Sequence, residues 1–85
     1  MSGWRIKGKG FRYEGGADPS ADVSHGFKFA IDRDGEQRSV NVEAARGAPS
    51  MSEASARSAV YQYLTDDPPR RIVMGSDGKL YPVTD

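Results

Sequence analysis

Apolar and polar residues alternate most regularly in the middle of the chain. Residues 27–31 follow this pattern, and the Asp34-Gly35 pair after them is the strongest short turn signal in the sequence. A two-residue turn at this pair places Phe29 opposite Val40 and leaves the apolar side chains of both segments on one face. We therefore predict a β-hairpin at the centre of the fold, with Phe29 in the core.

The N-terminal segment alternates too, but with a break. Trp4 and Ile6 occupy even positions, whereas Phe11 and Tyr13 occupy odd positions. A one-residue shift moves side chains to the other face of a sheet. The glycine-rich segment 8–10 lies at the break and permits the positive φ of a bulge or tight turn. A bulged single strand and a small hairpin both fit, and we predict the hairpin, with all four apolar side chains in the core.

A helical pattern follows the central hairpin. Ser50 and Glu53 fit a capping box, in which Ser50 is the N-cap and Glu53 the third helical residue. The pattern predicts a helix over residues 51–64, and the Pro68-Pro69 pair would end it. Five residues with helical spacing form one buried stripe on this helix. They are Ala56, Ala59, Val60, Tyr63 and Leu64.

The C-terminal part predicts a second hairpin. Asp77-Gly78 separates two apolar segments, and a two-residue turn at this pair places Met74 opposite Tyr81. Pro82 has no backbone N–H to donate to a neighbouring strand. We therefore expect the last strand at an edge of the sheet.

These segments predict one small domain over residues 1–85, with a flexible loop at residues 15–26, where turn-forming residues dominate. The predicted order of elements is β-β-β-β-α-β-β. A single amphipathic helix can cover one face of a sheet. The expected fold class is therefore α+β, an antiparallel β-sheet of hairpins with the helix packed on one face.

Composition excludes several classes of protein. The chain has 85 residues, 12 basic and 12 acidic side chains, and no cysteine. Zero net charge argues against a protein built mainly to coat DNA, and the lack of cysteine excludes disulfides and thiolate metal sites. No apolar run approaches the roughly 20 residues of a membrane span, and the N-terminus lacks the apolar region of a signal peptide. We expect a cytoplasmic protein with no membrane contact.

Charge is balanced overall but not locally. Residues 1–13 carry four basic side chains and no acidic one, whereas residues 14–37 carry six acidic and two basic side chains. The two blocks could be antiparallel neighbours whose charges cancel, or the first could form a basic contact face. We predict cancellation, and hence nucleic-acid binding no tighter than about 10 μM at physiological salt.

Catalytic and metal-binding patterns are weak. His25 is the one side chain that ordinarily titrates near neutral pH, and its neighbour Ser24 should point to the opposite face of an extended chain. Residues 32–43 begin like a calcium loop, but Gln37 stands where that loop needs glycine. No phosphate-binding glycine motif occurs. We predict an exposed loop histidine, no catalytic, cofactor or metal site, and no enzymatic activity.

Cations and aromatic side chains interleave near the N-terminus. Residues 9–13 are similar to the strand motif of RNA-recognition domains, although Arg12 stands where that motif has a small residue and Glu14 where it has valine. Tyr61 lies outside the helical stripe, beside Arg57, as an exposed interface anchor would. The candidate contact residues are Arg5, Lys7, Lys9, Arg12 and Tyr61.

The sequence therefore predicts a small non-enzymatic binding module, with another protein or a second copy of itself as partner. Nucleic-acid binding through the basic, aromatic N-terminal strand is the alternative. Exposure of an aromatic and cationic face within residues 1–13 would favour the alternative, as would binding that weakens steeply with salt.

Overall fold

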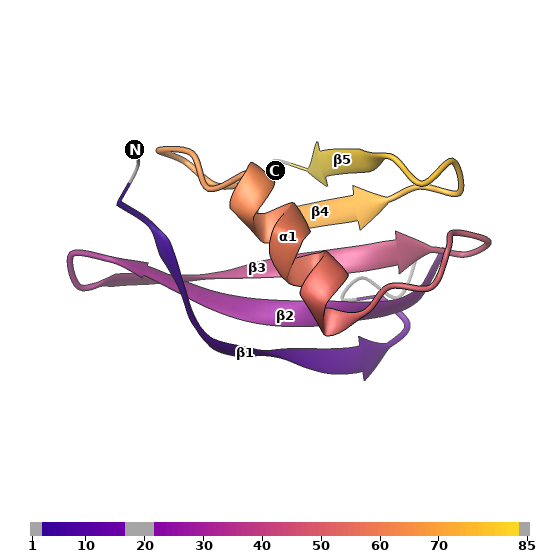
Figure 1. The fold of residues 1–85 in the computed structure, drawn as a ribbon, viewed down its shortest axis with the longest axis horizontal. Coiled ribbons are helices and arrows are strands. Elements are labelled where there is room, and N and C mark those ends of the chain that lie inside the picture. Colours follow the sequence, from indigo (N-terminus) through magenta and orange to yellow (C-terminus); the bar gives the residue numbers. More distant parts are fainter. Residues whose placement is uncertain (1–2, 17–21, 84–85) are drawn as a thin grey trace.

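The computed structural model describes residues 3–16 and 22–83, which form one sheet and one helix (Figure 1). The five strands lie in the order β1-β2-β3-β4-β5, so their order in space is their order along the chain. The elements are β1 (Arg5–Glu14), β2 (Val23–Arg33), β3 (Glu36–Ala45), α1 (Glu53–Gln62), β4 (Arg71–Met74) and β5 (Leu80–Val83).

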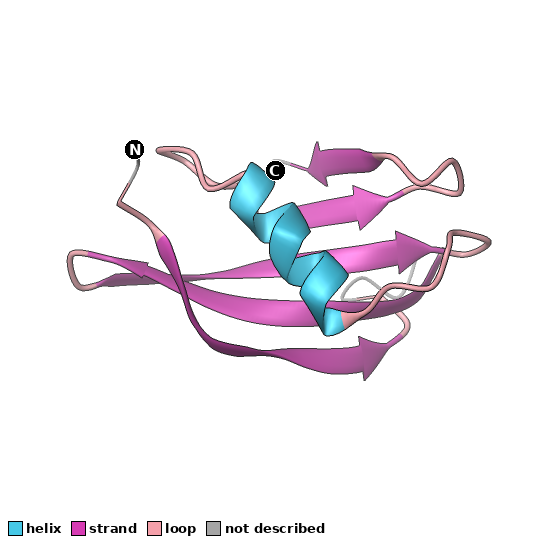
Figure 2. Ribbon diagram, in the orientation of Figure 1, coloured by secondary structure: helices cyan, strands magenta, loops and turns pink. Residues whose placement is uncertain are grey.

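The helix connects the two neighbouring strands that run parallel. β3 and β4 form this parallel pair, while the other neighbours are antiparallel. A parallel pair needs a crossover, and α1 supplies it by crossing one face of the sheet (Figure 2). The predicted α+β class is confirmed, as a mostly antiparallel sheet with one helix packed against it.

β1 is one strand with two extra residues, so the predicted N-terminal hairpin is wrong. Ile6 lies opposite Ile31 before the irregularity and Phe11 opposite Lys28 after it, which gives β1 two more residues than β2 over this stretch. An even number of added residues leaves the alternation unchanged. Phe11 and Tyr13 therefore lie on the face opposite Ile6. Phe11 is 72% exposed, and its predicted place in the core is wrong.

The irregularity in β1 is held by the helix. Gly8 has a φ of 79°, which glycine adopts without strain. The backbone N–H of Gly10 donates to Glu53 Oε2 at 3.0 Å, and Arg57 Nη2 donates to the Gly8 carbonyl at 2.9 Å. A Cβ on Gly10 would lie 2.5 Å from Cζ of Phe29, so this position must stay free of a side chain.

The central hairpin forms as predicted. Phe29 lies opposite Val40, and the turn residues Asp34 and Gly35 both have positive φ, as a two-residue hairpin turn requires. Phe29 is fully buried beneath the helix. The buried core cluster consists of Trp4, Phe27, Phe29, Ile31, Val40, Val42, Ala44, Met51, Ala56, Ala59, Val60 and Ile72.

The helix is shorter than predicted and has a different cap. Its N-cap is Ser52, whose hydroxyl accepts a hydrogen bond from the Ser55 backbone N–H, so the predicted capping box from Ser50 is wrong. Glu53 is the first helical residue, and its carboxylate accepts a hydrogen bond from Gly10 of β1 instead of taking part in a cap. The predicted stripe is present. Ala56, Ala59 and Val60 are buried, and Tyr63 and Leu64 pack partly buried against the core.

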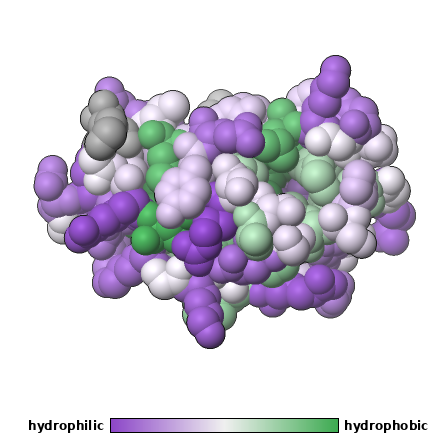
Figure 3. Space-filling view, viewed as in Figure 1, coloured by the Kyte–Doolittle hydropathy of each residue, from purple (hydrophilic) through white to green (hydrophobic). Residues whose placement is uncertain are grey.

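Hydrophobic surface remains on the helix side of the molecule. Figure 3 shows hydrophobic patches there, set among larger areas of hydrophilic surface. Partly buried apolar side chains pack against the core cluster from its periphery. They are Ile6, Ala48, Tyr63, Leu64, Met74 and Leu80.

The C-terminal hairpin forms with a longer loop than predicted. Met74 lies opposite Leu80 rather than Tyr81, a shift of one residue. The Asp77 carboxylate accepts hydrogen bonds from the Lys79 backbone N–H and the Tyr81 hydroxyl, and these contacts stabilise the wider loop. β5 is an edge strand, which confirms the expected position of Pro82.

The predicted loop at residues 15–26 is only partly described. Residues 17–21 lie outside the described residues. β2 already begins at Val23, so the last four residues of the predicted loop belong to the sheet.

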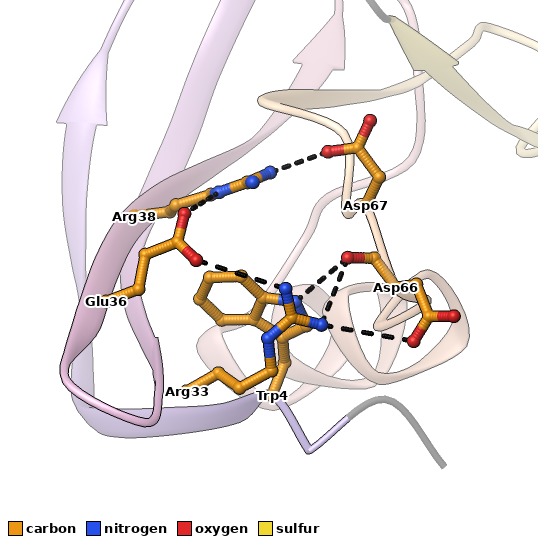
Figure 4. Close-up of polar contacts among 6 residues, drawn as sticks. All are labelled: Trp4, Arg33, Glu36, Arg38, Asp66 and Asp67. Carbon is orange, nitrogen blue, oxygen red and sulfur yellow. Dashed lines mark hydrogen bonds and ion pairs between the residues drawn. The ribbon is translucent and has the colours of Figure 1, made fainter.

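Trp4 joins the N-terminus to the hairpin end of the sheet (Figure 4). Its indole Nε1 donates to the Asp66 carbonyl at 3.2 Å, and the ring is nearly buried. The guanidinium carbons of Arg33 and Arg38 lie 4.5 and 5.0 Å from the ring centroid, within cation–π range. Arg38 also pairs with Asp67 at 2.7 Å. Trp4 is therefore a structural side chain.

The positive φ of Gly8 gives a test of the β1 irregularity. Gly8→Ala should lower the free energy of unfolding by more than about 1 kcal/mol, because alanine is strained at this φ. Lys9→Ala is the control, since Lys9 is exposed and has no positive φ, and it should change stability by less than about 0.5 kcal/mol. Urea denaturation measures both, and equal stabilities would contradict the proposed role of Gly8.

Candidate functional site

The sheet has one face that no helix or strand among the described residues covers. We call it the open face and define it by the side chains that alternate away from α1. It runs across all five strands. Its residues are Arg5, Lys7, Phe11, Tyr13, Gly26, Lys28, Ala30, Asp32, Gln37, Ser39, Asn41, Glu43, Arg71, Val73, Tyr81 and Val83.

A buried carboxylate lies at the centre of the open face. Glu43 is fully buried, and its Oε1 accepts from Arg71 Nε at 2.8 Å. Its Oε2 accepts from the Tyr13 hydroxyl at 2.7 Å. Gly26 lies between the strands that carry Tyr13 and Glu43, and a Cβ there would lie 2.7 Å from the tyrosine oxygen. The missing side chain of Gly26 therefore lets Tyr13 reach across to Glu43.

The environment of Tyr13 keeps its phenol neutral. Burial, followed by the hydrogen bond to Glu43, raises the pKa of the Tyr13 hydroxyl far above its usual value, which is about 10. Tyr13 is thus a fixed hydrogen-bond donor and no nucleophile. Together with Arg71 it compensates the buried charge of Glu43, which would otherwise be costly. This cluster supports the open face and offers no reactive group.

Exposed aromatic and cationic side chains surround this cluster. Phe11 is 72% exposed and lies directly opposite Lys28 on the neighbouring strand. Lys7 is exposed on the same strand as Phe11. Tyr81, 48% exposed, lies on β5, about 19 Å from β1 at the usual spacing of strands. An aromatic and cationic surface is therefore exposed within the N-terminal segment.

The predicted contact residues do not share one surface. Arg5 and Lys7 lie on the open face, and Lys9 lies in the irregularity of β1. Arg12 lies opposite buried Phe27, on the helix side, and Tyr61 is 58% exposed on the helix. The structure thus places four of these five residues on two different sides of the sheet, and Lys9 in the irregular segment between them.

Charge cancellation in the N-terminal segment is partial. Arg5 pairs with Asp32 across strands at 3.1 Å, and Arg12 pairs with Glu14 within β1 at 2.9 Å. Among the described residues, Lys7 forms no ion pair within 4 Å, and Lys9 forms none either. Two of the four cations therefore keep their charge available.

Sequence reasoning preferred a core position for Phe11 and Tyr13 and kept an exposed aromatic N-terminal strand as the alternative. It missed their neighbours Lys28, Glu43 and Arg71. The available signal was the alternation itself, because Phe11 and Tyr13 share odd positions and Ile6 does not. The buried position of Glu43 had no local signal. It depends on pairing with β4, which lies beyond the helix in sequence.

His25 differs from its prediction. It lies half-buried in β2, and its Nδ1 is 2.9 Å from Ser24 Oγ, although adjacent strand residues were expected to point apart. A second irregularity explains this contact. The register changes between Val23 and His25, so Ser24 is an extra residue, and such a bulge turns neighbouring side chains toward each other.

Among the described residues, the Ser24–His25 pair lacks the third member of a catalytic triad. The ring of His25 packs edge-on against Phe27, with centroids 6.5 Å apart. Its Nε2 is buried and has no hydrogen-bond partner among the described residues, so no carboxylate there orients the ring as a catalytic triad requires.

Within residues 3–16 and 22–83, no cluster of three or more potential ligand side chains could hold a metal ion. The described helix is also too short and too polar to cross a membrane. Comparison of the chain with protein-family models, curated proteins and solved structures finds no match in any of the three. The functional argument therefore depends on the geometry of the open face.

The buried Glu43 gives a stability test. Arg71→Met removes the charged partner of a fully buried carboxylate and should cost about 3–5 kcal/mol. The double variant Glu43→Gln/Arg71→Met removes both charges and should recover most of that loss. Urea denaturation at pH 7 measures both variants. A mild effect of Arg71→Met alone would show that Glu43 does not need this partner.

The raised pKa of Tyr13 predicts a pH dependence. The stability that Tyr13 contributes is complete below pH 10 and declines as the pH rises above 10, because the unfolded phenol ionises there while the folded one does not. Wild type should therefore lose up to about 1.4 kcal/mol per pH unit more than Tyr13→Phe above pH 10. Denaturation between pH 8 and 11 compares the two, and parallel curves would contradict the prediction.

Proposed function

We propose that the protein is a non-enzymatic binding module that binds single-stranded nucleic acid on its open face. The observation that carries the proposal is the exposure of Phe11 between Lys7 and Lys28 on a surface that no described helix or strand covers. Proteins that bind single strands combine aromatic platforms for the bases with cations that follow the phosphates.

The aromatic side chains supply the stacking surface. Phe11 and Tyr13 are alternate residues of one strand, so both rings lie on the open face about 7 Å apart along β1. Phe11 is the more exposed of the two, and stacking of one base on such a ring contributes about 1–3 kcal/mol. Tyr81 offers a second exposed ring at the far edge of the same face.

The charges of the open face favour a polyanion. Four cations lie on it, Arg5, Lys7, Lys28 and Arg71, against two carboxylates, Asp32 and Glu43. Each carboxylate is paired with an arginine of the same face, and Glu43 is fully buried. The charges left over are those of the two lysines beside Phe11. This modest excess, on a chain of zero net charge, implies weak and salt-sensitive binding.

Nucleic acid fits the open face better than a protein partner does. The buried centres of protein interfaces are depleted in lysine, because its ammonium is costly to desolvate. Here the most exposed aromatic ring has a lysine directly across from it and another earlier on its own strand. A phosphate backbone would pair with these lysines and leave them hydrated.

Binding can be measured by fluorescence anisotropy with labelled (dT)12 and (rU)12. We expect a Kd of about 10–100 μM at physiological salt, tightening as salt is lowered. Phe11→Ala should weaken binding at least fivefold through the lost stacking. Lys28→Gln should reduce the slope of log affinity against log salt by about 0.7, the value for one lost phosphate contact on a single strand.

Tyr61→Ala is the matched control for Phe11→Ala. Tyr61 is also an exposed aromatic residue, but it lies on the helix, away from the open face. Its removal should leave the affinity unchanged. Absence of salt-sensitive binding, or equal losses in the two variants, would exclude the open face as a nucleic-acid site.

A further inference from the structure

A second surface is the backbone edge of β3, at strand positions whose side chains belong to the open face. β3 has ten residues, but the parallel strand β4 pairs only with Asn41–Ala44. Residues 36–40 of β3 therefore have a strand partner on the β2 side only. Unpaired strand edges can accept an additional strand.

The backbone direction at this edge follows from one hydrogen bond. The Asn41 N–H donates to the Arg70 carbonyl at 2.9 Å, so the backbone groups of Asn41 point toward β4. Backbone groups alternate in direction along a strand. Those of Gln37 and Ser39 therefore point to the same side, where the strand pairing with β4 has ended.

A groove lies beside this edge. It has a volume of about 700 Å³, and its walls are residues 36–39 of β3 and residues 67–70, which lead into β4. The second wall contains Pro68 and Pro69, which have no backbone N–H. These two residues therefore cannot donate to the backbone carbonyls of Gln37 and Ser39, as a neighbouring strand would.

The two arginines of the groove differ in their ion pairs. Arg38 pairs with Asp67 at 2.7 Å and with Glu36 at 3.1 Å, and Figure 4 shows the guanidinium extended between these two carboxylates. Arg70 is exposed and forms no ion pair with another described residue. Arg70 is therefore the basic side chain of the groove lining that has no ion-pair partner in the described part of the chain.

We propose that this groove, which we call the edge groove, binds an extended peptide segment of another protein by adding it as a strand along residues 36–40. The backbone N–H and C=O groups of Gln37 and Ser39 would bind the peptide backbone. An acidic side chain of the peptide would pair with Arg70. The proposal is independent of nucleic-acid binding, since it uses backbone groups of β3 and the Arg70 side chain and not Phe11 or the two lysines beside it.

The test uses a phage-displayed library of random octapeptides selected on the full chain. Enriched sequences are then made as labelled synthetic peptides and titrated by fluorescence anisotropy. We expect enriched peptides that are rich in β-branched residues and contain at least one acidic residue. These peptides should bind with micromolar affinity.

Ser39→Pro removes the N–H that the added strand would use, and proline is tolerated at strand edges. It should weaken peptide binding at least tenfold. Ser39→Ala is the matched control, because it keeps the N–H and should bind within twofold of wild type. Arg70→Gln should weaken binding of the acidic peptides at least threefold. Gln37→Pro replaces Ser39→Pro if thermal melting shows that the latter is unfolded.

Two results would overturn the proposal. One is a selection that enriches no peptide over the starting library. The other is a set of enriched peptides that bind a folded edge-proline variant as tightly as wild type. Oligonucleotide binding measured in parallel should be the same for wild type and Arg70→Gln, which separates this site from the proposed nucleic-acid site.

Discussion

The contacts that Glu53 and Arg57 make with β1 determine how the two faces of the sheet differ. β1 departs from regular pairing at Gly8–Gly10, and the helix binds the backbone groups of the two glycines there. The same two side chains pair with each other at 2.7 Å, and the hydrogen bond from Arg57 holds the pKa of the Glu53 carboxylate below its usual value. β1 therefore stays beside the helix, while Phe11 and Tyr13 lie on the opposite face of the sheet and outside the core.

The open face shows how a sheet can carry a polar surface without losing order. Its central carboxylate is buried, and both of its oxygens are engaged by fixed donors from β1 and β4. Strands that are far apart in sequence are thus linked by side chains as well as by their backbones. Because Glu43 already has hydrogen-bond partners for both oxygens, the exposed aromatic and cationic residues around it remain available to a ligand.

Local signals predicted the parts of the fold that depend on local chemistry. The turn at Asp34-Gly35 and the alternation around Phe29 agreed, and the central hairpin formed as expected. Elsewhere a distant residue decided the outcome. The sequence placed Glu53 in a capping box, but its carboxylate accepts a hydrogen bond from the Gly10 N–H. Ser52 caps the helix instead.

The faces of β1 could not be assigned from the sequence for a related reason. Its apolar residues divide between odd and even positions, and alternation alone does not say which set the helix covers. Because β1 has two extra residues, Ile6 and Phe11 lie on opposite faces of the sheet. One extra residue would have placed them on the same face. Similarly, the second turn is wider than two residues, and its register differs by one residue from the predicted one. The Asp77 carboxylate accepts from the Lys79 N–H in this turn, and turn propensities do not reveal that contact.

The position of Trp4 has a spectroscopic consequence. It is the only tryptophan of the chain, it is nearly buried, and its indole holds the N-terminus to a carbonyl 62 residues away. Its emission should therefore shift to longer wavelength when the ring leaves these contacts and is exposed to water. Because it lies on the helix side of the sheet, a ligand stacked on Phe11 would not quench it directly. The protein thus contains its own optical probe of folding, separate from the surface on which binding is proposed.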